Sequence, residues 1–359
     1  MKKVLYMVNS LREGGAEKGL EFLIESNFFN DVDLHVVVLT RTNSALEKRL
    51  TEKLAGAITI CNAQSFSIAN IFRILLFVHS AIQKKSPDIV IASLTQAVLV
   101  SRLISLFYKC KHVTFEHSTK YASQLAYILL KMTDFTSGQF LVDSEITRAA
   151  LFDRAKRGAL YVPLYSSKDT PCDDIKKIYA VGDQLKVFSV GRLVATKNYE
   201  KSLFALSLLQ QRGFKFTYSI YGEGPEYEEL NALVNKLSLD GITFHGYCDD
   251  WQSRAKDYDC YLLNSNYEGL SIATLEAMNA ALPAVVTPVG EIAHYGKNGD
   301  NCIYVASVES IADALMKVAK SEQANKRLGV HARHTVMSKF NSDTVSNQLS
   351  IAAKELYGA

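Results

Sequence analysis

The sequence predicts an α/β protein of two domains, each built on a doubly wound parallel sheet. Short β-branched runs alternate with longer stretches of helical periodicity, which is the pattern of parallel strands joined by crossover helices. The alternation lapses once, near the middle of the 359 residues, and then restarts. A chain of this length is also long for one hydrophobic core and suits two.

Five apolar runs in the first half are expected to form buried parallel strands: KVLYMV, LHVVVL, DIVIAS, HVTFE and QFLVDS. Helical patterns lie between them at residues 16–25, 72–84 and 124–132. The first domain therefore spans residues 1–165. Residues 166–183 follow as a linker, because the region YVPLYSSKDTPCDD is rich in proline, serine and polar residues.

The second domain spans residues 184–340. Its expected strands are LKVFSVG, FKFTYSIYG, GITFHG, YDCYLLNS and LPAVVT. Helical patterns follow at residues 199–211, 225–237, 272–280 and 308–321. The stretch 342–356 is a single amphipathic helix within the C-terminal segment 341–359.

Composition and charge exclude several classes of protein. A hydrophobic fraction of 48% with 21% charged residues indicates a folded chain rather than a disordered one. The net charge of +3 divides into +6 for residues 1–165 and −3 for the rest. The six cysteines are scattered without a CxxC pair, so neither a zinc site nor a disulfide framework is predicted. No basic–aromatic module indicates nucleic-acid binding.

The N-terminal run MKKVLYMVNSL is interpreted as a first buried strand and not as a signal peptide, because it is short and lacks a small-residue cleavage site. No stretch reaches about 20 apolar residues without a charge, so no transmembrane helix is expected. We therefore expect a cytoplasmic protein.

Two glycine-containing turns follow expected strands. Gly14 and Gly15 come after the first strand, with Glu17 in the helix that follows, and they let the backbone approach a ligand closely. An ordinary strand-to-helix turn is the alternative. Arg192 and Lys197 follow the first strand of the second domain, at the sheet edge where ligands bind in such folds. Two cations there could neutralise a diphosphate without a metal. Solvated surface cations near a turn are the alternative.

The segment EGLSIATLE supplies the strongest signal. Glu268 lies in the loop after an expected strand, and Glu276 lies about one turn into the helix that follows. The backbone amides of Gly269, Leu270 and Ser271 are free at the helix start and can meet a phosphate or a sugar hydroxyl. Carboxylates accept hydrogen bonds from sugar and ribose hydroxyls. The alternative is one acid favoured by the helix dipole and one solvated glutamate.

A further pair, Glu116 and His117, ends a strand of the first domain. His117 could hydrogen-bond a donor or acceptor hydroxyl. A structural histidine with satisfied nitrogens is the alternative.

Taken together and in this order, these signals resemble the retaining GT-B glycosyltransferases of family 4. The resemblance is carried by GGAE, the EH pair, VDSE, GRL with the following KN, YGEGP and EGLSIATLEAM, and it covers nearly the whole chain. It implies two Rossmann-like domains with a cleft between them, and a C-terminal helix that crosses back to the first domain. One departure is the segment VPLYSS, where family members often carry an Asn–Pro element.

The resemblance also implies roles for the site residues. Arg192 and Lys197 would bind the donor diphosphate, Glu276 the ribose, and Glu268 and His117 the transferred sugar. No metal and no cofactor would be required. In the first domain, the loop with Gly14, Gly15 and Glu17, together with Glu116, would meet the diphosphate or the acceptor.

The implied reaction moves a hexose or N-acetylhexosamine from a nucleotide sugar, UDP-linked in preference to GDP-linked, to a saccharide or lipid-linked acceptor. Such transfers build bacterial surface polysaccharide, lipopolysaccharide or other glycans. A nucleotide-sugar isomerase or epimerase of the same fold, or a non-catalytic subunit, remains an alternative.

Basic and aromatic residues of the first domain favour contact with an anionic membrane surface. The residues concerned are Leu106, Phe107, Tyr108, Lys109, Lys111, Lys120, Tyr121, Tyr127, Leu130 and Lys131. We therefore expect peripheral association with the inner face of the cytoplasmic membrane. Ordinary helix packing with extended lysines is the alternative.

Overall fold

The protein folds into two compact units, shown in a computed structural model that describes all residues except 13, 118–122, 152–157, 168–182 and 359. The first unit comprises residues 1–165 and 343–359, and the second comprises residues 166–342. Most of the expected linker, residues 166–183, lies outside the described residues. The two chain segments that connect the units are hydrogen-bonded to each other, since the Ser167 amide donates to the Phe340 carbonyl at 2.7 Å.

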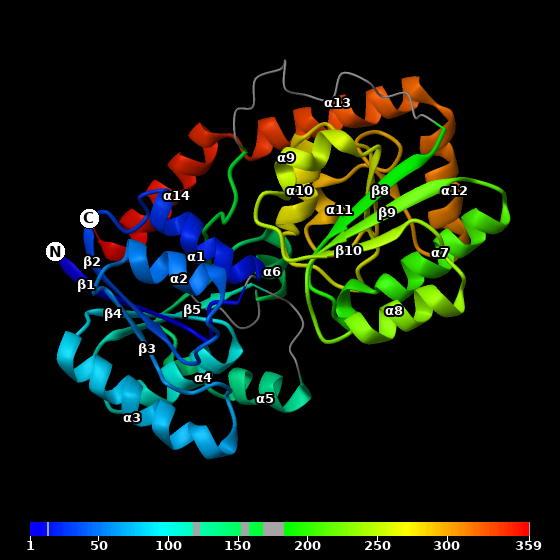
Figure 1. Cartoon of the computed structure of the whole chain (residues 1–359). Coiled ribbons are helices and arrows are strands. Elements are labelled where there is room, and N and C mark those ends of the chain that lie inside the picture. The colour runs from blue at the N-terminus through cyan, green and yellow to red at the C-terminus, as the bar shows by residue number, and fades with distance from the viewer. Residues whose placement is uncertain (13, 118–122, 152–157, 168–182, 359) are drawn as a thin grey trace. The chain divides into compact units, whose positions relative to one another are not determined.

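The first unit contains a seven-stranded parallel sheet in the order β3-β2-β1-β4-β5-β6-β7 (Figure 1). Its strands are β1 (Lys2–Val8), β2 (Val32–Val38), β3 (Ile58–Ile60), β4 (Ile89–Ser93), β5 (Lys111–Glu116), β6 (Gln139–Val142) and β7 (Ala159–Tyr161). Its helices are α1 (Gly15–Glu25), α2 (Ala45–Lys53), α3 (Ile68–Lys85), α4 (Thr95–Ile104), α5 (Gln124–Met132), α6 (Glu145–Ala150) and α14 (Ser342–Tyr357), with a 3₁₀ turn η1 (Asp134–Thr136).

Alternation along β1 divides the core of the first unit between the two faces of the sheet. Val4, Tyr6 and Val8 point to one face, where they pack with apolar residues of α1, α2 and α14. Leu5 and Met7 point to the other face, where they pack with apolar residues of α3, α4 and α5. Figure 1 shows the two helix layers on opposite sides of the strands.

Helix α14 belongs to the first unit although it ends the chain. Its apolar stripe, which includes Val345, Leu349 and Leu356, is buried in the core of that unit. The rings of Phe28 and Tyr357 lie 5.7 Å apart between their centroids. The C-terminal helix therefore packs on a sheet whose first strand begins at residue 2.

The second unit contains a six-stranded parallel sheet in the order β10-β9-β8-β11-β12-β13. Its strands are β8 (Leu185–Val190), β9 (Phe216–Tyr221), β10 (Ile242–Gly246), β11 (Cys260–Leu263), β12 (Ala284–Val286) and β13 (Ile303–Tyr304). Its helices are α7 (Tyr199–Gln211), α8 (Tyr227–Lys236), α9 (Trp251–Arg254), α10 (Ile272–Asn279), α11 (Ile292–Tyr295), α12 (Val308–Lys320) and α13 (Glu322–Lys339), with 3₁₀ turns η3 (Ala195–Lys197) and η4 (Ala255–Asp257).

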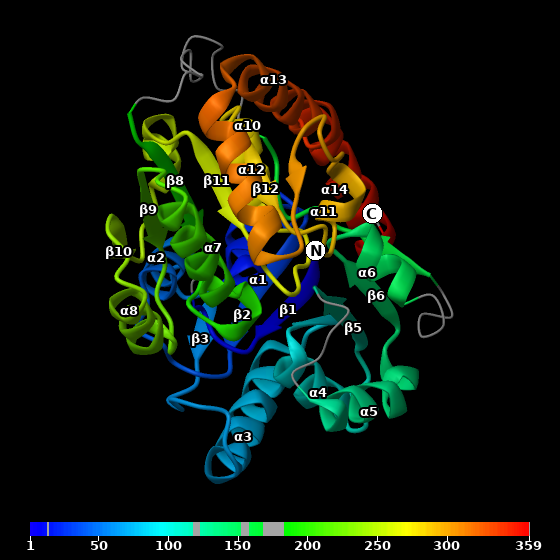
Figure 2. The ribbon, with the colours of Figure 1, turned by 90° about the vertical axis from the view of Figure 1, so that its right-hand side faces the viewer.

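The main core of the second unit lies between its sheet and the helices α7, α8 and α12, with α10 and α13 against the opposite face. Figure 2 shows the helices of this unit from a second direction. The predicted fold class, two Rossmann-like α/β domains, is confirmed. The structure adds three short edge strands, β3, β7 and β13, and the helices α2, α4, α6, α9, α11 and α13, which the sequence pattern did not predict.

Hydropathy sets one limit on how the chain can meet a lipid bilayer. Within the described residues, no helix combines the length and the apolar character that are needed to cross a membrane.

We predict an acid-sensitive contribution to stability from His112, which is buried at the start of β5. Its Nδ1 lies 2.9 Å from the hydroxyl of Ser101, and burial lowers its pKa from 6.5 to about 4. Between these two values the unfolded chain binds a proton that the folded chain does not. The free energy of unfolding must therefore fall as the pH is lowered from 6.5 towards 4.

Urea unfolding at pH 7 and pH 4.5 measures this loss in the wild type and in His112→Gln. The variant should lose about 2 kcal/mol less than the wild type over the same pH interval. Equal losses in the two proteins would contradict the assignment.

Candidate functional site

The strand order of the second unit creates a natural ligand position at the carboxyl ends of β8 and β11. The chain leaves β8 towards β9 on one side and later returns to β11 on the other side. Loops that follow such a pair of strands diverge and leave room between them, and ligands of doubly wound sheets bind there. The loop of residues 191–198 follows β8, and the loop of residues 264–271 follows β11.

The loop after β8 is held by close backbone packing. Leu193 is buried, and its amide donates to the Glu223 carbonyl at 2.9 Å. A Cβ atom at Gly224 would lie 2.2 Å from the Leu193 carbonyl oxygen, so only glycine fits at this position. Arg192, next to this anchor, is exposed. The loop therefore presents a guanidinium to solvent from a fixed backbone.

The structure brings Lys197 and Glu268 into direct contact. The Nζ of Lys197 lies 2.6 Å from Oε1 of Glu268, with side-chain exposures of 20% and 9%. The hydroxyl of Ser265 donates to the same carboxylate oxygen. The lysine stem passes over Gly191, where an added Cβ would lie 3.1 Å from its Cε. This pair unites two predicted site residues that are 71 positions apart in the sequence.

Asparagine side chains fix the spacing of the two loops. The Asn266 amide donates to the Thr196 carbonyl at 2.8 Å, and its side chain donates to the Ala195 carbonyl at 3.3 Å. Asn198, which has a φ of 51°, donates through Nδ2 to Oδ1 of Asn266 at 3.1 Å. Sequence reasoning missed Asn266, because only the folded chain shows that its loop touches the loop after β8.

The start of α10 offers backbone donors. Ser271 is the N-cap residue of α10 and has a φ of 59°, a left-handed conformation that turns the chain sharply into the helix. Among the described residues, no hydrogen bond uses the amides of Gly269, Leu270 or Ser271. Consecutive free amides at a helix N-terminus attract anions.

Glu276 lies on α10 but does not join the charged pair. It is the fifth residue of the helix, and its Oε1 accepts a hydrogen bond from Nε2 of Gln252 at 2.7 Å. Burial, helped by the carboxylates of Glu268 and Glu276, raises the pKa of Tyr261 well above its ordinary value. Glu268 and Glu276 thus each have their own polar partner.

The backbone of Glu268 packs closely against Gly290, in the segment that follows β12. Gly290 has a φ of 57°, and a Cβ there would lie 2.2 Å from the Glu268 carbonyl oxygen and 2.6 Å from that of Gly269. The Glu291 amide donates to the Gly269 carbonyl at 2.9 Å. The segment after β12 thus packs directly against the loop that carries Glu268.

The first unit places a chain of polar side chains at the carboxyl edge of its own sheet. His117 lies between Asp143, whose Oδ2 is 2.9 Å from Nδ1, and Ser93, whose hydroxyl is 2.8 Å from Nε2. His117 follows β5, Asp143 follows β6, and Ser93 is the last residue of β4. Both ring nitrogens are therefore held by protein groups. Asp143 and Ser93 were not predicted, because their positions depend on three separate strands.

The predicted acidic and glycine residues of the first unit lie nearby. Glu17 is buried and turns back on Gly14, where a Cβ would meet its Oε2 at 2.3 Å. Gly15 opens α1 and has open space at its Cβ position. Burial, together with the charges of Glu17 and Asp143, raises the pKa of Tyr6 well above its ordinary value.

Two further residues at the carboxyl edge of the first sheet, Glu116 and Leu94, differ from what the sequence indicated. Glu116 is also buried, at 7% exposure, and it is the last residue of β5 and not part of a loop. Leu94, directly after Ser93, has a φ of 73° and a ψ of 153°. That backbone region is almost restricted to glycine and costs about 1–3 kcal/mol for other residues. Such strain is commonly found next to ligand sites.

Residues 173–335 match the family model described as glycosyl transferases group 1. This segment is similar to the group 1 glycosyltransferases. The match contains the whole constellation of the second sheet edge, from Arg192 to Gly290. It covers less than half of the 359 residues and does not reach the first unit.

Curated proteins that are similar to about half of this chain carry the names of different glycosyltransferases and synthases. N-acetyl-α-D-glucosaminyl L-malate synthase of Bacillus anthracis is 27% identical over 183 residues, which cover 48% of this chain and 46% of that protein. α-D-Kanosaminyltransferase of Streptomyces kanamyceticus is 26% identical over 188 residues, which cover 51% of this chain and 49% of that protein. The chain thus spans about half the length of these relatives.

Solved structures show the fold over the whole chain. The Anabaena protein HepE, in complex with UDP and glucose, superposes with a TM-score of 0.81 at 18% identity, and the match covers 100% of both chains. Sucrose-phosphate synthase of Thermosynechococcus elongatus superposes with a TM-score of 0.78 at 15% identity, again over 100% of both chains. The fold is therefore that of the GT-B glycosyltransferases, as the sequence predicted.

We predict that Gly290 is required for two reasons: its positive φ and the close approach of the loop that carries Glu268. Gly299 is a matched control, since it also has a positive φ, of 75°, but has no atom within 4 Å of its Cβ position. Gly299→Ala should cost about 1–2 kcal/mol for the left-handed conformation alone. Gly290→Ala should cost about 1–3 kcal/mol more, because its methyl group overlaps two carbonyl oxygens.

Urea unfolding of the two variants measures this difference. Equal free energies of unfolding for Gly290→Ala and Gly299→Ala would show that the segment after β12 does not support the Glu268 loop.

Proposed function

We propose that the protein is a retaining glycosyltransferase that moves a hexose or N-acetylhexosamine from a nucleoside-diphosphate sugar onto an acceptor. The observation that carries the proposal is the Lys197–Glu268 pair at the divergence of β8 and β11, beside a row of free backbone amides. A cation, a carboxylate and amide donors in one place match a diphosphate joined to a polyhydroxylated sugar.

Donor binding would divide the ligand among the site residues. Arg192, Lys197 and the amides of residues 269–271 would hold the diphosphate, and Glu276 would accept hydrogen bonds from the ribose. As the diphosphate approaches, Lys197 would turn from Glu268 towards a phosphate oxygen. That exchange frees the Glu268 carboxylate to accept from a hydroxyl of the transferred sugar.

A charged leaving group explains why cations are needed. When the glycosidic bond to the phosphate breaks, negative charge develops on the diphosphate, and fixed positive groups lower the energy of that state. In our proposal Arg192 and Lys197 supply this charge without a metal ion. UDP is the favoured nucleotide because structural neighbours are described in complex with UDP or UDP-glucose. A GDP-linked donor is the alternative, since one relative is a GDP-mannose-dependent transferase.

His117 would serve the transfer step through the polar chain of the first unit. The Asp143 carboxylate accepts from Nδ1–H, which leaves Nε2 as an acceptor facing the Ser93 hydroxyl. Rotation of that hydroxyl would let Nε2 accept a hydrogen bond from a substrate hydroxyl. Asp143 is then a positioning residue, because it fixes the tautomer of His117 without touching the substrate.

The acceptor would be a saccharide or lipid-linked molecule in the assembly of a surface polysaccharide or another glycan, on the cytoplasmic side of the membrane. An isomerase of the same fold would convert a nucleotide sugar with no acceptor, and a non-catalytic subunit would bind the donor without turnover. Mass spectrometry of products formed from UDP-glucose or UDP-N-acetylglucosamine, with and without acceptor saccharides, separates these three functions.

We predict that the two cations at the sheet edge bind the diphosphate specifically. Arg192→Met and Lys197→Met should each lower the affinity for UDP about tenfold or more, because each removes a charge-assisted hydrogen bond. The affinity for uridine, which lacks the diphosphate, should change by less than about threefold. Isothermal titration calorimetry measures both ligands.

Lys215→Met is the matched control, because the exposed Lys215 precedes β9 at the amino edge of the same sheet. It should bind UDP like the wild type. Arg192 is exposed, so its replacement should leave the melting temperature unchanged. Wild-type UDP affinity in Arg192→Met and Lys197→Met would refute the assigned diphosphate site.

We predict that Asp143→Asn lowers kcat by about 10- to 100-fold and leaves the dissociation constant for UDP within about threefold of the wild type. The amide group cannot hold the Nδ1–H tautomer as a carboxylate does. Asp143→Glu, which keeps the carboxylate, should recover part of kcat. Steady-state kinetics and calorimetry provide the two readouts.

Asp88→Asn is the control, because Asp88 accepts from the Lys3 amide just before β4, at the opposite edge of the first sheet. It should keep the wild-type kcat. A parallel loss of kcat and UDP affinity in Asp143→Asn would indicate a structural defect and contradict a positioning role.

A further inference from the structure

Exposed apolar side chains concentrate on α3, on the end of α4 and on α5, all in the first unit. On α3, Ile68, Phe72 and Leu76 are 94%, 69% and 53% exposed. Their spacing of four residues places them on one side of the helix, opposite the buried Ile74 and Val78. This outward stripe is not explained by the core of the unit, because that core is served by the other side of α3.

Helix α5 shows the same feature more strongly. Leu125, Ile128, Leu129 and Met132 are exposed, and their i, i+3, i+4, i+7 spacing places them on one face. Leu130 is the one buried residue of this helix. Burial of apolar side chains therefore contributes little to the packing of α5 on the first unit.

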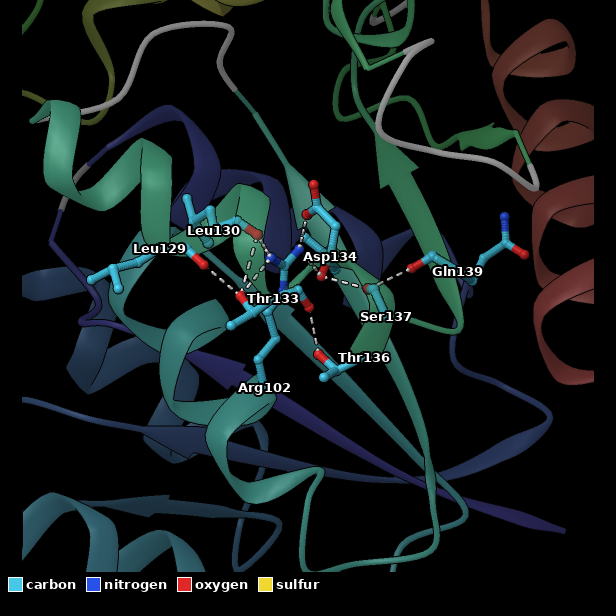
Figure 3. Close-up of polar contacts among 9 residues, drawn as sticks. Arg102, Leu129, Leu130, Thr133, Asp134, Thr136, Ser137 and Gln139 are labelled. Atoms are coloured by element: carbon cyan, nitrogen blue, oxygen red, sulfur yellow. Dashed lines mark hydrogen bonds and ion pairs between the residues drawn. The ribbon is translucent and has the colours of Figure 1, made fainter.

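Polar contacts to a buried arginine hold α5 instead. Arg102 of α4 is 2% exposed and lies beside the C-terminal end of α5 (Figure 3). It binds the Leu130 carbonyl, the Thr133 hydroxyl at 3.2 Å and the Asp134 carboxylate at 2.9 Å. A cation at the C-terminal carbonyls also stabilises the helix dipole. The apolar face of α5 is thus held outward by a fixed anchor.

The end of α4 joins the two helices into one surface. Leu103, Leu106 and Phe107 are exposed at the end of α4 and in the turn that follows. The next residue, Tyr108, reaches α3, where its hydroxyl lies 2.6 Å from Nδ1 of His79. Figures 1 and 2 both place α3, α4 and α5 at the same end of the first unit. We refer to the exposed apolar residues of these three elements as the α3–α5 face.

The charged residues within the helices of the α3–α5 face are of one sign. The helices α3, α4 and α5 contain no aspartate or glutamate. Exposed cations accompany the apolar residues at Arg73, Lys84, Lys85, Lys109 and Lys131. Two copies of such a face would repel each other, whereas an anionic surface would attract it.

We propose that the α3–α5 face docks onto an anionic lipid surface, with its apolar side chains at the headgroup boundary and its cations against lipid phosphates. Apolar stripes flanked by lysine and arginine bind membranes in this manner without crossing them. The docking goes beyond the proposed function and does not depend on it, because vesicle binding is measured without donor or turnover.

The structure also corrects the membrane surface expected from the sequence. Leu130 is buried in the core, and Tyr108 is half-buried against His79, so neither belongs to the docking face. Ile68, Phe72 and Leu76 on α3 were not predicted to belong to it. Lys120 and Tyr121 lie outside the described residues.

Co-sedimentation of the full chain with lipid vesicles tests the proposal. The wild type should bind vesicles that contain about a third phosphatidylglycerol and should bind phosphatidylcholine vesicles weakly, with binding to the former falling as salt rises. The double variant Leu125→Gln/Met132→Gln should lower the partition coefficient at least about tenfold. Lys131→Glu should lower it about fivefold or more.

Matched controls use equivalent residues outside the face. Val330→Gln/Ile351→Gln replaces two exposed apolar residues, of 49% and 57% exposure, on α13 and α14. Lys236→Glu replaces an exposed lysine on α8. Both should bind vesicles like the wild type, and all variants should keep the wild-type melting temperature because the replaced side chains are exposed.

Two outcomes would overturn the proposal. One is a wild-type protein that fails to sediment with anionic vesicles at low salt. If that protein instead forms dimers that the variants of the α3–α5 face dissociate, the face binds a second copy of the chain and not a membrane. The other is equal vesicle binding by the face variants and the controls.

Discussion

The ion pair between Lys197 and Glu268 depends on the topology of the second sheet. Because β8 and β11 are neighbours in the sheet, the loops at their carboxyl ends start side by side, and the side chains of Lys197 and Glu268 make contact between them. A largely buried ion pair is a weak source of stability, since both charges must be removed from water. Its position is therefore explained better by ligand binding than by folding, because a phosphate can replace the carboxylate as the partner of the lysine.

Close backbone packing surrounds the Lys197–Glu268 pair. Gly224 and Gly290 bring neighbouring segments within contact of Leu193 and Glu268, and Asn266 ties one loop to the other. The first sheet follows a similar plan with different chemistry. Its edge presents a histidine between a carboxylate and a hydroxyl, next to the strained Leu94. In both units regular strands position the polar groups, and unusual backbone angles occur where the chain leaves them.

The sequence predicted the strands and helices with strong periodicity, and it placed Lys197 and Glu268 after strands that the structure shows to be neighbours in the second sheet. It missed β3, β7 and β13, because two or three residues at a sheet edge give no recognisable alternation. It also missed α13, whose charged residues leave only a weak apolar stripe. The buried states of Glu17 and Glu116 could not be predicted, because nothing local distinguishes a solvated glutamate from one that packs against the sheet.

Contacts between residues that are distant in the sequence also could not be predicted. The motifs indicated Lys197 and Glu268 separately, but their contact requires the register of two strands that are not adjacent in sequence. Asp143 lies in the VDSE motif but was given no role, and its contact with His117, like that of Ser93, depends on the alignment of β4, β5 and β6. The periodicity of α5 was clear, yet it could not show which face remains open, because that depends on Arg102 and on Asp134 beyond the helix end.

A crystal structure of this chain with UDP would test the central claim most directly. The account predicts the diphosphate within hydrogen-bonding distance of Lys197 Nζ and the amides of residues 269–271, with Lys197 turned away from Glu268 and the ribose hydroxyls at Glu276. A diphosphate bound anywhere else on the chain, with the Lys197–Glu268 pair intact, would contradict it.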